Sequence, residues 1–189
     1  MATEEAPFRV VTKEGDFEVR DYAEQVVAET WVEEDFQDAG NTAFRKLFGY
    51  ISGDNRARED IAMTAPVAQR EQGEKIAMTS PVGQRATSEG WAVSFMMPSG
   101  FTLDTTPEPT DPAVRIRAIP QQRMATIRYS GRWTEKNYRE YLAELESWIA
   151  AQGLTVIGAP VFARYNPPFT PPFWRRNEIL IPVETPGAE

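Results

Sequence analysis

The 189-residue chain contains neither cysteine nor histidine. Without cysteine, disulfides, thiolate metal sites and thiol nucleophiles are excluded. Without histidine, the chain lacks the commonest metal ligand, the commonest general base and the usual axial ligand of haem iron. It also has no Gly-rich phosphate loop and no G-x-S-x-G nucleophile motif. These absences argue against an enzyme and against a metal site.

Two further features are absent, a long apolar run and a basic stripe. No stretch approaches the ~20 apolar residues of a membrane-spanning helix, and the first residues lack the basic and apolar segments of a signal peptide. We therefore expect a cytoplasmic protein without a membrane span. Positions 1–40 hold 12 acidic against 3 basic residues, and the remainder holds 16 against 17, for a net charge of −8. Nucleic-acid binding is not expected from this distribution.

The periodicity of apolar residues predicts a strand, strand, helix unit near the N-terminus. Alternation predicts strands over Asp16–Tyr22 and Val26–Val32. Helical spacing then predicts an amphipathic helix over Ala43–Ile51, with Asn41 or Thr42 as its N-cap.

The same order recurs about 97 residues later. The second unit has strands Val114–Ile119 and Met124–Tyr129, then a helix capped by Thr134 and stopped at Gly153. Further strands are predicted at Ile61–Val67, Ile76–Val82, Trp91–Met97, Thr155–Tyr165 and Glu178–Val183. We therefore expect a single α+β domain, 1–189. Its duplicated ββαββ-type halves, about 8–106 and 113–184, would form a distorted antiparallel sheet or barrel with two main helices in a pseudo-twofold arrangement.

Two seven-residue phrases, IAMTAPV at Ile61–Val67 and IAMTSPV at Ile76–Val82, differ at one position. As strands, each would present an Ile-Met-small-Val row on one face. The simplest interpretation is a pair of matching core rows with Met as an adaptable filler. In the alternative, Met63 or Met78 forms a wall of a ligand pocket or a thioether ligand of iron.

These phrases belong to a set of motifs that spans nearly the whole chain: FEVRDY, AFRKLFGYISGDN, both MT-x-PV phrases, FMMPSGF and RYNPPFTPPFWRRNEILIPV. In these motifs the sequence resembles the SOUL haem-binding protein family. The resemblance implies binding of haem or a related tetrapyrrole in an apolar depression beside the first helix, near the Pro-rich loop, in a carrier, buffer or sensor role. The chain has no histidine, so a haem or other porphyrin would not be His-ligated.

The resemblance also implies contact residues on the helix and on the loop. Aromatic side chains suit the faces of a flat macrocycle, and arginines or lysines suit its propionates. The implied contacts are Asn41, Phe44, Arg45 and Phe48 on the helix, Tyr165, Phe169 and Phe173 on the loop, and Arg45, Lys46, Arg175 or Arg176 for the propionates.

Two alternatives remain open from the sequence. The chain also resembles the GyrI-like ligand-binding superfamily, in which an acidic residue in an aromatic cleft recognises lipophilic cations or assists hydrolysis. Glu178 would take that role with a raised pKa, or would simply pair with Arg175, Arg176 or another arginine. In the other alternative, the aromatic residues of the loop 165–174 grip a protein partner, or they fold back on the core.

Overall fold

The computed structural model describes residues 3–56 and 73–184. Nine strands form one sheet in the order β10-β4-β8-β7-β12-β13-β11-β3-β2, and every neighbouring pair is antiparallel. The strands of this sheet are β2 Phe8–Glu14, β3 Phe17–Tyr22, β4 Gln25–Val32, β7 Val82–Thr87, β8 Gly90–Met96, β10 Val114–Ile119, β11 Gln122–Tyr129, β12 Val161–Arg164 and β13 Asn177–Val183.

The other elements are two helices, two short strand pairs and one turn of 3-10 helix. They are α1 Phe36–Ser52, α2 Glu135–Ala151, the pair β1 Glu4–Glu5 with β6 Thr79–Ser80, the pair β5 Asn55–Arg56 with β9 Glu108–Pro109, and η1 Pro172–Trp174. Neither helix is long and apolar enough to cross a membrane among the residues that the structure describes.

The sheet has the same plan when followed inward from β10 or from β3. The series β10-β4-β8-β7 corresponds to β3-β11-β13-β12, and β2 is an extra strand at one edge. Ile116 pairs with Ala28 on one side, and Val19 pairs with Ala125 on the other, so equivalent positions lie 97 residues apart. The expected α+β fold, with an antiparallel sheet and two main helices, is confirmed. The described strands form a curved open sheet rather than a closed barrel, because β10 and β2 are its edges.

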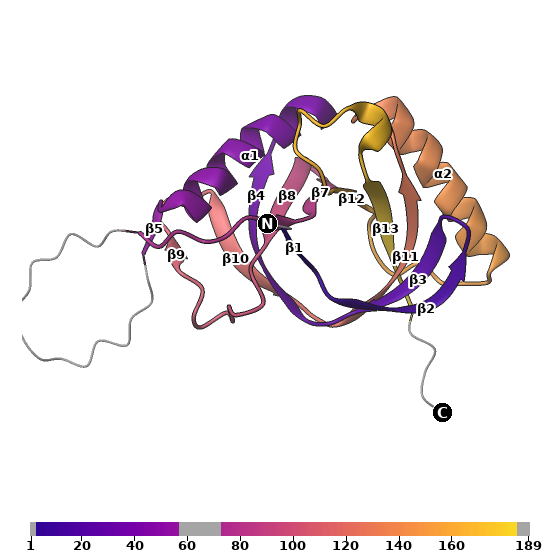
Figure 1. The fold of residues 1–189 in the computed structure, drawn as a ribbon, viewed down its shortest axis with the longest axis horizontal. Coiled ribbons are helices and arrows are strands. Elements are labelled where there is room, and N and C mark those ends of the chain that lie inside the picture. The colour runs from indigo at the N-terminus through magenta and orange to yellow at the C-terminus, as the bar shows by residue number, and fades with distance from the viewer. Residues whose placement is uncertain (1–2, 57–72, 185–189) are drawn as a thin grey trace, which may run out of the picture.

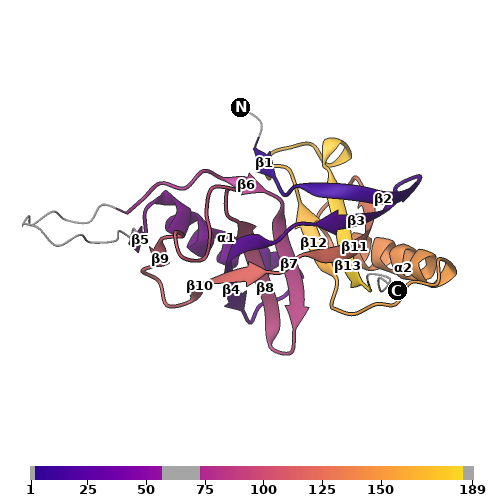
Figure 2. The ribbon, with the colours of Figure 1, turned by 90° about the horizontal axis from the view of Figure 1, so that it is seen from below.

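Both helices cover one face of the sheet, one over each half (Figure 1; Figure 2). Leu47 of α1 is fully buried against residues such as Val93 and Phe95 of β8. Leu145 of α2 is fully buried in a second cluster that includes Ile179 of β13. The periodic apolar residues of the two helices therefore build two cores on a common sheet. We call the face away from the helices the inner face.

The first helix begins earlier than the sequence predicted. The Asp35 carboxylate accepts the N–H of Asp38 at 3.0 Å, which places the start at Phe36 rather than at Asn41 or Thr42. Gly40 lies inside the helix, beside the Arg164 guanidinium of β12. The predicted N-cap was wrong because Gly40 and Asn41 favour a loop locally, whereas burial of Phe36, Ala39 and Ala43 in the core extends the helix through them. The predicted cap of the second helix is confirmed, since Thr134 Oγ1 accepts the N–H of Asn137 at 3.3 Å.

The second copy of the repeated phrase does not form the predicted core row. Ile61–Val67, including Met63, lies outside the described residues. In the second phrase only Thr79 and Ser80 precede Pro81 as a strand, and they pair with β1 instead of with the main sheet. The predicted strand over Ile76–Val82 was wrong: Ile76 is buried, but Met78 is 36% exposed. The reason is local: the Thr79 hydroxyl donates to the Met96 carbonyl, and Pro81 has no N–H to donate to a neighbouring strand.

Three other strands of the main sheet differ from the sequence prediction, and the first is β7, Val82–Thr87, which follows Pro81 where no strand was predicted. β12 covers Val161–Arg164 only, and Val156 forms an isolated bridge with Val183. β2 was not predicted. All of its residues are exposed at the sheet edge. Its sequence, FRVVTKE, therefore lacks the alternation of apolar and polar residues that predicts a half-buried strand.

Candidate functional site

A depression of about 630 Å³ lies between α1 and the Pro-rich connection that joins β12 to β13. This connection, Tyr165–Arg176, arches between the two helices at the top of Figure 1. Seven of the thirteen residues predicted from the sequence line the depression: Asn41, Phe44, Arg45, Phe48, Met78, Tyr165 and Phe169. The segment from Met78 to Val82 and the side chains of Trp133 and Arg164 complete it.

Two rings of α1 form an aromatic wall of the depression. Phe44 and Phe48 are four residues apart, so their rings lie on one helix face and stack with centroids 5.8 Å apart and planes 13° apart. Phe44 also meets Phe95 of the core edge-on at 5.3 Å. Phe48 is 50% exposed and Phe169, on the other side, is 86% exposed. Phe44 thus packs the aromatic wall against the core, while the exposed half of the Phe48 ring offers apolar area to a ligand in the depression.

Arg164 reaches into the same depression from the end of β12. Its guanidinium carbon lies 5.0–5.6 Å from the ring centroids of Phe36, Trp133 and Phe162. Its Nη2 donates to Gln84 Oε1 at 2.6 Å. Burial lowers the pKa of Arg164 from 12.5 to about 10, so the group stays protonated at neutral pH. Sequence reasoning missed this residue, because nothing in the segment VFARY distinguishes it from an ordinary strand arginine.

Three of the predicted residues lie on the connection but outside the depression. Arg175 braces the connection: it donates to the carbonyls of Thr170 at 2.8 Å and Pro168 at 2.7 Å and lies 4.1 Å from the Trp133 ring centroid. Phe173 packs against Trp174 at 5.1 Å and remains 68% exposed. Arg176 turns to the inner face of the sheet, where it donates to Glu5 and Glu178.

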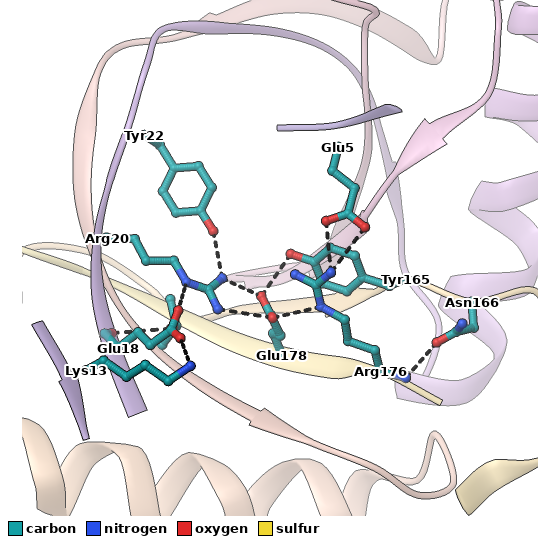
Figure 3. A network of polar contacts seen from close by, with 10 residues as sticks. Glu5, Lys13, Glu18, Arg20, Tyr22, Tyr165, Asn166, Arg176 and Glu178 are labelled. Carbon is teal, nitrogen blue, oxygen red and sulfur yellow. Dashed lines mark hydrogen bonds and ion pairs between the residues drawn. The ribbon is translucent and has the colours of Figure 1, made fainter. Parts of the chain in front are cut away.

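Glu178 lies on the inner face, fully buried within a polar network (Figure 3). Its carboxylate accepts from Arg20 at 2.7 and 3.2 Å, from the Arg176 Nε at 3.0 Å and from the Tyr165 hydroxyl at 2.8 Å. Burial alone would raise the pKa of Glu178, but hydrogen bonds and charge from Arg20, followed by Arg176 and Tyr165, hold it below its usual value. The predicted raised pKa was therefore wrong. The alternative in which an arginine pairs with Glu178 describes the contacts.

The network around Glu178 balances its own charges. A chain of contacts joins acids and bases in alternation: Lys13, Glu18, Arg20, Glu178, Arg176 and Glu5. A carboxylate with this many donors offers no free lone pair in a favourable direction to a cationic ligand or to a water that needs a base. Glu178 thus stabilises the inner face and links it, through the Tyr165 hydroxyl, to the depression on the other side.

The inner face has a smaller hollow of about 120 Å³, lined by residues such as Tyr22, Glu29 and Met124. Its volume is about a fifth of that of the depression, too little for a macrocycle. Glu29 is occupied as well, because Arg117 lies 3.0 Å and Arg85 3.6 Å from its carboxylate. Within the described parts of the chain, no cluster of acidic side chains could hold a metal ion.

Comparison with known proteins points to one family. Residues 3–182 match the family model described as SOUL heme-binding protein. The chain is 29% identical over 195 residues to Heme-binding protein 2 of Mus musculus, and this alignment covers 100% of the chain and 89% of that protein.

Solved structures share the fold at much lower identity. EcmrR in a DNA complex has a TM-score of 0.63 at 12% identity, over 89% of this chain and 57% of that chain, so this chain spans little more than half of it. The EcmrR C-terminal domain has a TM-score of 0.55 at 14% identity, over 94% and 98% of the two chains. A hydrolase from Listeria innocua has a TM-score of 0.57 at 12% identity, over 92% and 94%. These similarities show the fold alone.

Proposed function

Because the chain belongs to the SOUL heme-binding protein family, we propose that it binds haem or a related tetrapyrrole between α1 and the Pro-rich connection, without a histidine ligand. The observation that carries the proposal is the half-exposed Phe48, stacked on Phe44, in a depression of about 630 Å³. That volume lies within the usual range of ligand pockets, about 300–1,000 Å³. A flat apolar ligand is the occupant that such a wall favours.

The Pro-rich connection supports the proposal because it is held before any ligand arrives. Pro167, Pro168 and Pro171 restrict its backbone, and Arg175 ties two of its carbonyls together. Phe169, which is exposed, is carried on this braced segment. A rigid ligand would then lose little affinity to ordering of the loop.

We also propose that iron contributes little to affinity. Burial, and then the charge of Glu178, raises the pKa of Tyr165, so its hydroxyl stays protonated and donates to Glu178 instead of ligating iron as a phenolate. Met78 is available at the rim as a soft thioether, which is the weaker kind of haem ligand for ferric iron. Burial of the macrocycle faces is then the main source of binding energy.

A carrier, buffer or sensor role fits a pocket without catalytic groups, and we keep the expectation that the protein acts in the cytoplasm. The recurrence of the 97-residue shift in both strand pairings supports the hypothesis that the two halves arose by internal duplication.

Absorbance titration of the native protein and of Phe48→Ala with haemin and with iron-free protoporphyrin tests the proposal. A phenylalanine buries roughly 200 Å² when fully covered, and Phe48 is half exposed. Covering about half of the remaining ~100 Å² contributes about 1.3 kcal/mol at ~25 cal/mol/Å², or about tenfold in affinity. We expect Phe48→Ala to weaken both ligands about tenfold, with thermal unfolding showing that the variant is still folded at the titration temperature.

The control is Phe173→Ala, which removes an exposed ring from outside the depression and should leave both affinities unchanged. Unchanged affinity in Phe48→Ala would contradict the location of the pocket. A six-coordinate low-spin haemin spectrum, with no binding of the iron-free porphyrin, would contradict iron-independent binding.

A second candidate function rests on three large exposed aromatic rings at the connection, Phe169, Phe173 and Trp174, which are 86%, 68% and 73% exposed. Exposed aromatic clusters are typical of protein interfaces. We propose that Phe173 and Trp174 contact a protein partner while the depression holds the ligand. The double variant of these two residues should then lose a partner captured by the native protein but keep porphyrin affinity. Loss of porphyrin affinity in the same variant would instead place the two rings in the pocket.

A further inference from the structure

Arg164 is a half-buried cation without an anionic partner among the described residues. None of the ion pairs formed within residues 3–56 and 73–184 includes it. Its one hydrogen bond goes to a neutral acceptor, Gln84 Oε1, and its buried Nε has no partner in that part of the chain. Burying a charge among aromatic rings costs several kcal/mol unless an opposite charge compensates it.

Arg20 is a buried arginine of the same chain whose charge is compensated, and it serves as a comparison for Arg164. Its side chain is 4% exposed, and two carboxylates face it, those of Glu18 at 2.6 Å and Glu178 at 2.7 Å. Arg164 faces three rings and an amide instead. The difference is that the charge of Arg20 is compensated by carboxylates within the inner face, whereas Arg164 lines the depression without such compensation.

The surroundings of Arg164 hold its guanidinium in position toward the depression. Gln84 turns its oxygen to Arg164 because its Nε2 donates to the Phe36 carbonyl at 3.0 Å. On the opposite side, Gly40 leaves room: a Cβ there would lie 2.5 Å from Nη1 and 3.1 Å from Nη2. A helix-interior glycine is unfavourable for α1, and its effect here is to admit the guanidinium beside the helix.

We propose that Arg164 is an anion subsite at the floor of the depression, where its guanidinium receives a carboxylate of the ligand. The proposal rests on the proposed tetrapyrrole binding and adds a selectivity to it. A ligand would insert one acidic substituent toward Arg164 while its rings lie against Phe44 and Phe48. The carboxylate and the half-buried guanidinium would then neutralise each other beneath the ligand, where a charge-assisted hydrogen bond is stronger than in bulk water.

The subsite predicts that the native protein distinguishes an acid from its ester. Protoporphyrin IX and its dimethyl ester share the macrocycle and differ in charge at the propionates. A charge-assisted hydrogen bond in a buried site is strong enough for about a tenfold preference for the acid. Quenching of tryptophan fluorescence in the native protein measures both affinities.

Three variants test whether the preference comes from Arg164. Arg164→Met keeps the length of the side chain without its charge and should reduce the acid affinity about tenfold, leave the ester within about twofold, and so abolish the preference. Gly40→Ala, which places a methyl group against the guanidinium, should also reduce the preference while alanine favours the helix. The control is Arg139→Met, an exposed arginine on α2 far from the depression, which should keep the native preference.

The outcomes separate the subsite from the pocket. If the native protein binds neither porphyrin, the proposed function fails. If it binds the acid and the ester equally, the pocket stands and the subsite is wrong. If Arg164→Met folds, as judged by its thermal unfolding, and retains the preference for the acid, another cation such as Arg45 receives the carboxylate. Should Arg164→Met not fold, Gly40→Ala decides: an unchanged preference overturns the subsite.

Discussion

Replacing Glu178 by glutamine keeps the size of the side chain and removes the charge that Arg20 and Arg176 share. The carboxylate has two oxygens, and each accepts two hydrogen bonds: Oε2 from Arg20 and Tyr165, Oε1 from Arg20 and Arg176. An amide has one oxygen, so one pair of donors would face an NH₂ group that is itself a donor. The Tyr165 hydroxyl can rotate to accept from it, but the arginines cannot.

The cost follows from burial of the partners. Breaking a buried ion pair by removing one partner costs about 3–5 kcal/mol, because the remaining charge is left without compensation. Arg20 keeps Glu18 at 2.6 Å, and Arg176 keeps the half-exposed Glu5, so we expect the lower end, about 3 kcal/mol. For a domain of this size, that is a fall in melting temperature of roughly 6–12 °C.

Urea and thermal unfolding of Glu178→Gln and of the control Glu29→Gln measure the difference. Glu29 is also buried, but its partners Arg117 and Arg85 have side chains 45% and 35% exposed and can turn to water. We expect about 1 kcal/mol for the control. If Glu178→Gln lost no more stability than Glu29→Gln, the idea that the network of Figure 3 stabilises the fold would be refuted.

Two further predictions concern acid and backbone strain. A hydrogen bond from Arg123 lowers the pKa of Asp21 to about 2, and the pKa of Glu178 is also lowered. The contributions of these two carboxylates to stability are therefore complete above about pH 5. The unfolding free energy should decline as the pH falls from about 5 to about 2, whereas a flat profile would contradict the assignment. Gly90 has φ +125°, and a Cβ there would lie 2.3 Å from the Val32 carbonyl oxygen. Gly90→Ala should cost about 2 kcal/mol or more in urea denaturation, against about 1 for Gly15→Ala, where the space is open.

The strand and helix repeat could be predicted from the sequence because local periodicity determines it. The two strand pairs and both helices follow patterns of apolar residues that need no knowledge of distant contacts. The start of α1 could not be placed in the same way. Gly40 interrupts the helical pattern locally, and the reason for it, the guanidinium of Arg164, comes from a strand near the other end of the chain.

In the candidate site too, residues whose role follows from local spacing could be predicted, and residues whose role depends on distant contacts could not. The spacing of Phe44 and Phe48 predicts one helix face, and the structure brings both rings to the depression. The role of Arg164 could not be predicted from the sequence. The rings that surround its guanidinium include Phe36 of α1 and Trp133 of the segment before α2, both distant from it in the chain. Glu178 stood out as a charge in an apolar strand, but its main partner lies 158 positions away on β3.

The sheet order bears on how the chain folds. β3 and β4 are consecutive, yet they do not pair: β3 lies against β11, and β4 lies against β10, so each half of the sheet is completed by a strand from the other half. These pairings close loops of about a hundred residues, whose entropy must be lost before the contacts form. During synthesis, the first half therefore leaves the ribosome with the edge of β4 uncovered until residues 114–119 have been made. Folding is expected to be slow and to need nearly the whole chain, and the edge of β4 is the surface most exposed to aggregation until then.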